Sequence, residues 1–158
     1  MINNPMLYTG SSGSSSTTRH TLTITYSISG ETAPATYTAT YAEGTSYGVP
    51  SPTIVGYTPS QARVDGVMGE EDISVTVTYS VNAYQLRVVY MDVGGTVLHD
   101  PSVQSVYYKA SYSVTSPTIS GYTVTEGQET ISGTMPARDV IENVFYTPDI
   151  EDDAETPA

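Results

Sequence analysis

Only a few residues in this sequence have the types and neighbours that catalysis requires. His99 stands beside Asp100 in a serine-rich chain, and a histidine oriented by a carboxylate can activate a serine nucleophile. No nucleophile-elbow motif accompanies His99, and thiol chemistry is excluded because the chain has no cysteine. We place His20 in a Ser/Gly-rich tether and His99 in an exposed loop. Neither histidine predicts a hydrolase.

Two acidic clusters, Glu70–Asp72 and Glu151–Asp153, contain the carboxylates that glycoside hydrolysis or calcium binding would use. Paired catalytic carboxylates need a defined separation, whereas neighbours in an extended segment point to alternate sides. Neither cluster has the alternating ligands and the turn glycine of an EF-hand loop. We therefore interpret both as solvated charges. The sequence predicts a protein that is not an enzyme, with no catalytic, cofactor-binding or metal-binding residue.

The charge balance restricts the partners. Seventeen Asp and Glu residues against five Lys and Arg give a formal net charge of −12. Phosphate backbones are bound through clustered cations, and this chain has no such cluster, so we predict no nucleic-acid partner. An anionic bilayer is disfavoured for the same reason, and no apolar run reaches the ~18 residues of a membrane span. We therefore expect no membrane partner.

Tyrosine is the side chain best suited to adhesive contacts here, since the chain has 14 Tyr, one Phe and no Trp. A tyrosine ring offers a flat apolar face with a hydrogen-bonding tip, against which sugars can lie. Alternation within predicted strands assigns four tyrosines to cores, namely Tyr26, Tyr79, Tyr90 and Tyr146. The better candidates for ligand contact on the surface are Tyr84, Tyr107 and Tyr108.

The chain is an internal duplication. Ser51–Thr58 recurs as Ser116–Thr123 with seven identities in eight positions at an offset of 65. Flanking matches place repeat 1 at residues 21–81 and repeat 2 at residues 84–148, after an N-terminal anchor and Ser/Gly tether (1–20) and before an acidic tail (149–158). Only Asn82 and Ala83 separate the repeats, which is too short for a flexible linker. We therefore expect two modules placed end to end.

Each repeat is predicted to be mainly β, with little helix, because apolar and polar residues alternate with a period of two. Leu22, Ile24 and Tyr26 alternate with threonines, and a Gly94-Gly95 pair in repeat 2 suits a hairpin turn. In the shared Ser-Pro-Thr-Ile-x-Gly-Tyr-Thr segment, the proline favours a connection and the glycine a turn with positive φ. The last strand of repeat 2 has Glu142 where repeat 1 has Val75, so a register shift is possible there.

Both repeats resemble the MucBP (mucin-binding protein) module of Gram-positive surface proteins. The resemblance rests on five features, the opening strands that end in Tyr26 or Tyr90, the Gly44-Thr-Ser-Tyr47 and Lys109-Ala-Ser-Tyr112 segments, the two Ser-Pro-Thr-Ile-x-Gly-Tyr segments, Gly133-Thr-Met-Pro136, and the closing strand at Tyr79. Asp92 with Gly95 resembles the family's Asp-containing first turn, which repeat 1 lacks. The resemblance implies a β-grasp-like fold and a role in adhesion.

Two hypotheses for the function follow from this layout. The first is a non-enzymatic structural protein on the surface of a virion, such as a bacteriophage head decoration, fibre or tail-associated protein. In it an apolar N-terminal segment would bind other proteins of an oligomeric particle, through Ile2, Pro5, Met6, Leu7 and Tyr8. We favour this hypothesis over the alternative below, because no export signal is evident at Met1. The alternative is a fragment of a Gram-positive cell-surface adhesin, extracellular or on the cell surface, that binds mucin glycans. Under either hypothesis the modules would contact a host surface or glycans by stacking and hydrogen bonds, weakly per module and with avidity from many copies.

Overall fold

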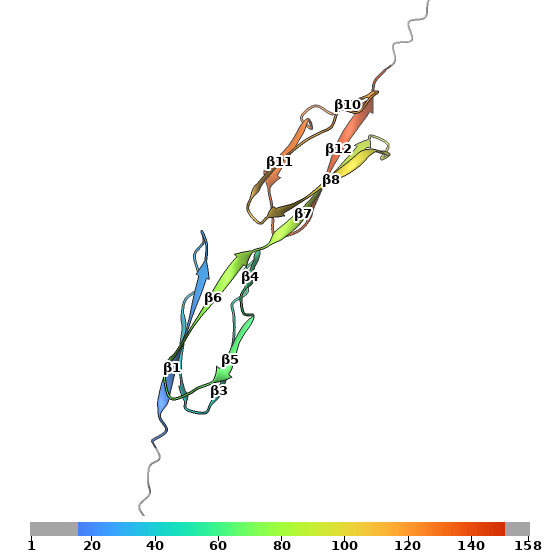
Figure 1. The fold of residues 1–158 in the computed structure, drawn as a ribbon. Helices are drawn as coiled ribbons and strands as arrows, with labels where there is room; N and C mark the ends of the chain where they lie inside the picture. Colours follow the sequence, from blue (N-terminus) through green and yellow to red (C-terminus); the bar gives the residue numbers. More distant parts are fainter. Residues whose placement is uncertain (1–15, 151–158) are drawn as a thin grey trace, which may run out of the picture.

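The computed structural model describes residues 16–150, which form two similar β modules joined end to end (Figure 1). No helix occurs in this range, and so none that is long and apolar enough to cross a membrane. Module 1 contains the strands β1 (Arg19–Ile28), β2 (Tyr37–Ala42), β3 (Ser46–Pro50), β4 (Tyr57–Pro59), β5 (Arg63–Val67) and β6 (Ile73–Val81). Module 2 contains β7 (Ala83–Asp92), β8 (Val97–Tyr107), β9 (Ser111–Thr115), β10 (Tyr122–Val124), β11 (Thr130–Thr134) and β12 (Val140–Pro148).

Each module is a four-stranded mixed sheet with a two-stranded unit beside it. The sheet orders are β2-β1-β6-β4 and β8-β7-β12-β10, and the small units are β3-β5 and β9-β11. The first and last strands of each module, β1 with β6 and β7 with β12, pair in parallel at the centre of the sheet. The long connection that parallel neighbours require contains the remaining strands of the module. The mainly β, two-module prediction is confirmed.

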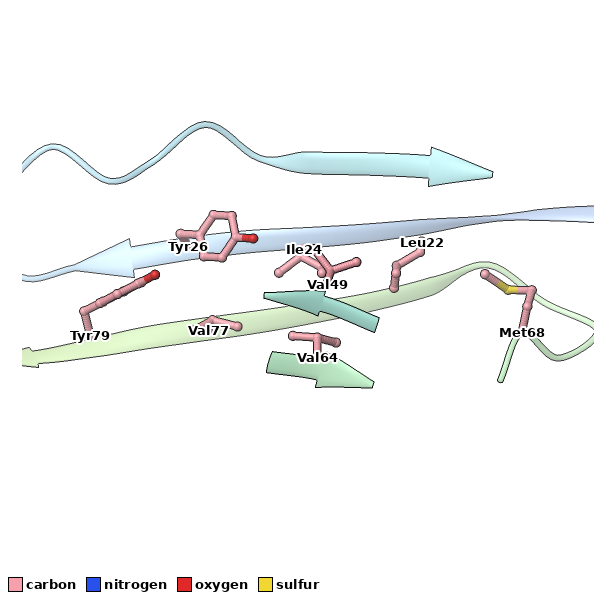
Figure 2. Close-up of a cluster of buried hydrophobic side chains, with 8 residues drawn as sticks. All are labelled: Leu22, Ile24, Tyr26, Val49, Val64, Met68, Val77 and Tyr79. Carbon is pink, nitrogen blue, oxygen red and sulfur yellow. The ribbon is translucent and has the colours of Figure 1, made fainter. Parts of the chain in front are cut away.

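The core of module 1 lies between the sheet and the β3-β5 unit, as Figure 2 shows. The alternation read from the sequence determines which side chains point inward, since successive residues of a strand face opposite sides. The outward neighbours in β1, β2 and β6 are serines and threonines, for example Thr23 beside Thr38 and Ser74. The buried set of this core is Leu22, Ile24, Tyr26, Val49, Val64, Met68, Val77 and Tyr79.

Module 2 has a separate core built by the corresponding residues. Leu86, Val88, Tyr90 and Tyr146 match Leu22, Ile24, Tyr26 and Tyr79, and the remaining members are Val106, Met135 and Val144. The four tyrosines predicted for cores, Tyr26, Tyr79, Tyr90 and Tyr146, are all at most 6% exposed. Each module thus has a complete core of its own.

The shared Ser-Pro-Thr-Ile-x-Gly-Tyr-Thr segment forms the connection and turn that its sequence predicts. Gly56 and Gly121 have φ of 80° and 77°, a region that favours glycine. In each module a buried tyrosine hydroxyl donates a hydrogen bond to the carbonyl of the segment's proline. The Tyr79 hydroxyl lies 2.6 Å from the Pro52 oxygen, and the Tyr146 hydroxyl lies 2.7 Å from the Pro117 oxygen. The segment is therefore held to the last strand of the sheet.

The last strand of repeat 2 shows no register shift. Glu142 pairs with Val88 as Val75 pairs with Ile24, and Val144 and Tyr146 remain inward as Val77 and Tyr79 do. The buried residues on both sides of Glu142 fix the register, because a slip by one residue would expose them. Glu142 is therefore a carboxylate on the inward face, half-buried, with the Tyr112 hydroxyl 3.5 Å from it.

The first turn of module 2 is the expected hairpin at Gly94-Gly95. One carboxylate oxygen of Asp92 accepts hydrogen bonds from the backbone N–H groups of Gly94 and Thr96, both at 2.8 Å. These bonds, that of Thr96 above all, lower the pKa of Asp92. The following strand β8 begins at Val97, and irregular pairing with β7 interrupts the alternation that would predict a strand from the sequence. His99 therefore lies in a strand and not in a loop.

Candidate binding surfaces

The two histidines take part in strand structure. The ring of His99 packs edge-on against the ring of Tyr90, with centroids 5.6 Å apart, and its Nδ1 lies 2.9 Å from the carbonyl oxygen of Asp100. His20 is part of β1 and not of a tether, with its Nδ1 4.0 Å from the Asp72 carboxylate. No serine hydroxyl is among the hydrogen-bond partners of either histidine within the described residues. The geometry of a catalytic triad is not present around them.

The acidic cluster at Glu70–Asp72 has a structural contact that its sequence did not predict. The Asp72 carboxylate accepts a hydrogen bond from the backbone N–H of Thr21 at 2.6 Å. Asp139 accepts the corresponding bond from Gln85 at 2.8 Å. Each carboxylate thus ties the start of the last strand to the start of the first one. No group of three or more potential metal ligands occurs within residues 16–150.

Of the three tyrosines predicted for ligand contact, only Tyr107 has an exposed ring, at 60%. Tyr84 is half-buried and packs against the core of module 2. Tyr108 is half-buried at the boundary with module 1. These placements do not test ligand binding, which stays a prediction for all three. The anchor residues Ile2, Pro5, Met6, Leu7 and Tyr8 lie outside the described residues.

Module 2 has a more apolar outer sheet face than module 1. Ile141 and Val103 flank Arg87 across three neighbouring strands, and they are 67% and 51% exposed. Tyr107 ends the same face beside Ala83. The corresponding face of module 1 carries serine and threonine hydroxyls instead. Although the two modules share one plan of strands, they therefore present different chemistry to a partner.

A cavity of about 380 Å³ opens at the end of module 2 that is remote from module 1. Its wall combines the rings of Tyr122 and Tyr146, the apolar side chains of Ile119 and Val124, and several hydroxyls. Glu129 is the only ionisable carboxyl group lining it, and no cationic side chain does. Aromatic faces with scattered hydroxyls and no cation suit an uncharged polar ligand better than an anionic one. This cavity was not predicted from the sequence, because it forms between β10, β12 and the connection after β9.

The junction between the modules is ordered by specific contacts. Strand β6 passes into β7 through Asn82 alone (Figure 1). The Asn82 N–H donates to the Gly56 oxygen at 2.8 Å, and the Asn82 side-chain oxygen accepts from the Thr58 hydroxyl at 2.6 Å. From module 2, the Tyr108 N–H donates to the Asn82 oxygen at 2.9 Å. Asn82 thus bonds to both modules.

Side chains close the same junction. The ring of Tyr108 covers Gly56 so closely that a β-carbon at Gly56 would overlap it, and it meets the ring of Tyr57 edge-on. Lys109 forms an ion pair with Glu31 of module 1, which raises the pKa of Lys109. Its ammonium group also lies 5.6 Å from the centroid of the Tyr108 ring. The end-to-end arrangement predicted from the short linker is confirmed, with contacts that restrict bending.

Two models of protein families match the chain. Residues 85–147 match the model of the MucBP domain, and residues 6–83 match that of the Muc B2-like domain. The expected MucBP resemblance is thus confirmed, with repeat 1 matching the Muc B2-like variant. No curated protein matches the chain.

The fold is similar to that of a solved structure. The TIE protein of Bacillus anthracis is 12% identical with a TM-score of 0.54, over 80% of this chain and 33% of that one. This chain therefore spans about one third of the TIE protein, and at this identity the likeness concerns the fold alone. A MucBP domain from Lactobacillus acidophilus is 19% identical with a TM-score of 0.32, over 43% of this chain and 92% of that one. The type 2 repeat of the mucus binding protein MUB from Lactobacillus reuteri is 15% identical with a TM-score of 0.36, over 82% of this chain and 100% of that one.

Proposed function

We propose that this protein is a non-enzymatic adhesion segment of a Gram-positive surface protein. The chain has a Muc B2-like domain at residues 6–83, followed by a MucBP domain at residues 85–147. The two-domain composition is the observation that carries the proposal. It favours the alternative drawn from the sequence over the virion hypothesis, since no comparison points to a particle protein. The name of the Lactobacillus reuteri relative, a mucus binding protein, suggests host mucus as the target.

The ordered junction supports a role as a projecting rod. A segment that carries an adhesive site away from a cell wall has to resist folding back on itself. Asn82 and Tyr108 link the two modules by backbone hydrogen bonds and ring packing, so the second module keeps its direction relative to the first. The termini of the described range lie at opposite ends of this rod (Figure 1).

The ligand we propose is an uncharged mucin-type glycan, bound in the cavity of module 2. A net charge of −12 opposes sialylated or sulfated chains, because like charges repel. The cavity offers instead the half-buried ring of Tyr122 for stacking and threonine and serine hydroxyls for hydrogen bonds. One such site binds weakly, and adhesion gains strength from many copies on one cell.

Titration of the isotope-labelled chain with neutral and with sialylated mucin oligosaccharides, followed by NMR, tests this proposal. Thr118 lines the cavity with an exposed side chain, so Thr118→Phe is expected to reduce the shifts caused by neutral glycans at least tenfold. Thr53→Phe, at the corresponding position of module 1, is the matched control and should bind normally. Tyr107→Ser tests the outer sheet face in the same way. If no neutral glycan shifts any resonance in module 2, glycan binding by this segment is wrong.

A further inference from the structure

The free end of module 2 reproduces one half of the junction between the modules. The Asp149 N–H donates to the Gly121 oxygen at 2.9 Å, as the Asn82 N–H does to Gly56 at 2.8 Å. The Thr123 hydroxyl donates to the Asp149 carboxylate at 2.6 Å, the distance found between Thr58 and Asn82. The two hydrogen bonds that Asn82 forms with module 1 therefore recur at Asp149 with module 2.

The strand pairing around this end is also the same. Tyr122 pairs with Pro148 as Tyr57 pairs with Val81. We call Gly121, Tyr122 and Asp149 the distal surface, and Gly56, Tyr57 and Asn82 the junction surface. Because both have the same backbone hydrogen bonds and the same glycine conformation, a partner that fits the junction surface has the right geometry for the distal one.

The two surfaces differ in what covers them. Gly56 is buried, because the Tyr108 ring lies where its β-carbon would be. Gly121 is exposed, and the space beside it contains no atom of the described residues within 4 Å. A glycine turn next to a half-exposed aromatic ring thus lies open at the end of the rod.

We propose that the distal surface binds the strand-connecting turn of a further β module, one that presents an aromatic side chain as Tyr108 does. The ring would lie flat over Gly121 and edge-on to Tyr122, and the backbone N–H of the same residue would donate to the carbonyl oxygen of Asp149. Asp149 adds a carboxylate that the neutral Asn82 lacks. A basic residue after the aromatic one, as Lys109 follows Tyr108, is therefore favoured in the partner.

A second copy of this chain does not provide that turn. Gly44 and Lys109 are equivalent, since both have positive φ and both donate their N–H to the oxygen of the buried Met68 or Met135. Glu43 therefore stands at the position of Tyr108. It has no ring to cover Gly121, and its charge would be repelled by Asp149. The partner is a module with a turn like that of module 2, and the chain alone is expected to stay monomeric.

An extended chain tests the proposal while keeping both modules intact. Residues 83–149 are inserted once more between Asp149 and Ile150, so that the new copy of Ala83 follows Asp149 as Ala83 follows Asn82. Small-angle X-ray scattering should give a rod that is longer by one module, and NMR relaxation should show all three modules tumbling as one body. Independent tumbling of the inserted module, with its signals still those of a folded domain, would overturn the proposal.

Variants of the inserted copy separate docking from simple attachment. Tyr108→Ala in the inserted copy should release the third module and shorten its apparent rotational correlation time by about half or more. Tyr107→Ala in the inserted copy is the matched control and should leave the rod rigid, because Tyr107 points to the outer sheet face. Equal behaviour of the two variants would also contradict the proposal. Tyr122 belongs both to the distal surface and to the wall of the cavity proposed for the glycan. Both variants are therefore compared in the absence of glycan, so that the adhesion proposal can fail or hold separately.

Discussion

The ring of Tyr108 in module 2 lies edge-on to the ring of Tyr57 in module 1, with centroids 5.9 Å apart and planes at 84°. Such edge-to-face pairs contribute roughly 0.5–1.5 kcal/mol beyond the burial of their surface. The neighbouring Lys109 has a φ of 64°, a conformation that costs free energy in any residue other than glycine. Module 1 has Gly44 at the equivalent place. The lysine is explained by its ion pair with Glu31 across the junction, which a glycine could not form.

Substitution of the two turn glycines should show how much of the junction depends on Tyr108. Gly56→Ala and Gly121→Ala carry the same backbone cost of about 1–2 kcal/mol, because both glycines have φ near 80°. Gly56→Ala also displaces the Tyr108 ring, which adds roughly 1–3 kcal/mol. Urea unfolding of both variants measures the difference. Equal destabilisation would contradict the close packing at the junction.

Removal of the buried tyrosine hydroxyls should destabilise each module. Tyr79→Phe leaves the Pro52 carbonyl without its donor, and Tyr146→Phe does the same to Pro117. Each substitution is expected to lower the free energy of unfolding by about 1–2 kcal/mol. Tyr107→Phe, on an exposed ring, is the control and should change it by less than about 0.5 kcal/mol. Thermal denaturation monitored by circular dichroism distinguishes these outcomes.

The same two tyrosines should make the protein sensitive to alkali. Burial is the main cause that raises the pKa of Tyr79 and of Tyr146 above the ordinary value of 10.0. The folded state therefore holds these protons more tightly, and this contribution to stability is complete below pH 10 and is lost as the pH rises through the folded-state pKa. Urea unfolding measured between pH 8 and pH 11 should show the decline. The decline in the free energy of unfolding should be smaller in the Tyr79→Phe, Tyr146→Phe double variant.

Glu142→Val should stabilise module 2. The carboxylate lies half-buried on the inward face of β12, where module 1 has Val75, and its Tyr112 contact is long at 3.5 Å. Replacing it removes a desolvated charge and adds apolar contact, for an expected gain of about 0.5–1.5 kcal/mol. Val75→Glu is the reverse variant and should destabilise module 1. The Glu142 charge also raises the pKa of Tyr112, after burial, so a spectroscopic titration of Tyr112 should move downward in Glu142→Val.

Loss of the Asp92 carboxylate should loosen the first turn of module 2. Hydrogen bonds from backbone N–H groups lower the pKa of Asp92, so its contribution to stability is present above its unfolded-state pKa near 4 and is lost as the pH falls through the lower folded-state value. Asp92→Ala should therefore destabilise the protein at pH 7 and reduce the acid dependence of unfolding. Hydrogen exchange at Gly94 and Thr96 should become faster. Unchanged exchange there would show that the turn does not depend on the carboxylate.

The sequence by itself determined the duplication, the strands and most of the two cores. A period of two leaves only one face of β1 apolar, so its inward residues follow directly from the order of side chains. The sequence also predicted the turns at Gly56 and Gly121 and the hairpin at Gly94-Gly95. These turns depend on local backbone geometry, which limits the residues that fit there.

Only the tertiary structure decided the facts that depend on contacts between distant segments. Irregular pairing in β8 placed His99 in a strand, and buried neighbours held Glu142 inward against its own hydrophilic preference. The Tyr108 ring became a junction residue because Gly56, 52 positions earlier, has no β-carbon to exclude it. The open counterpart at Gly121 is visible only after both surfaces are compared in space. Local rules fix alternation and turns, whereas packing between segments far apart in the chain fixes which surfaces are covered and which remain available to a partner.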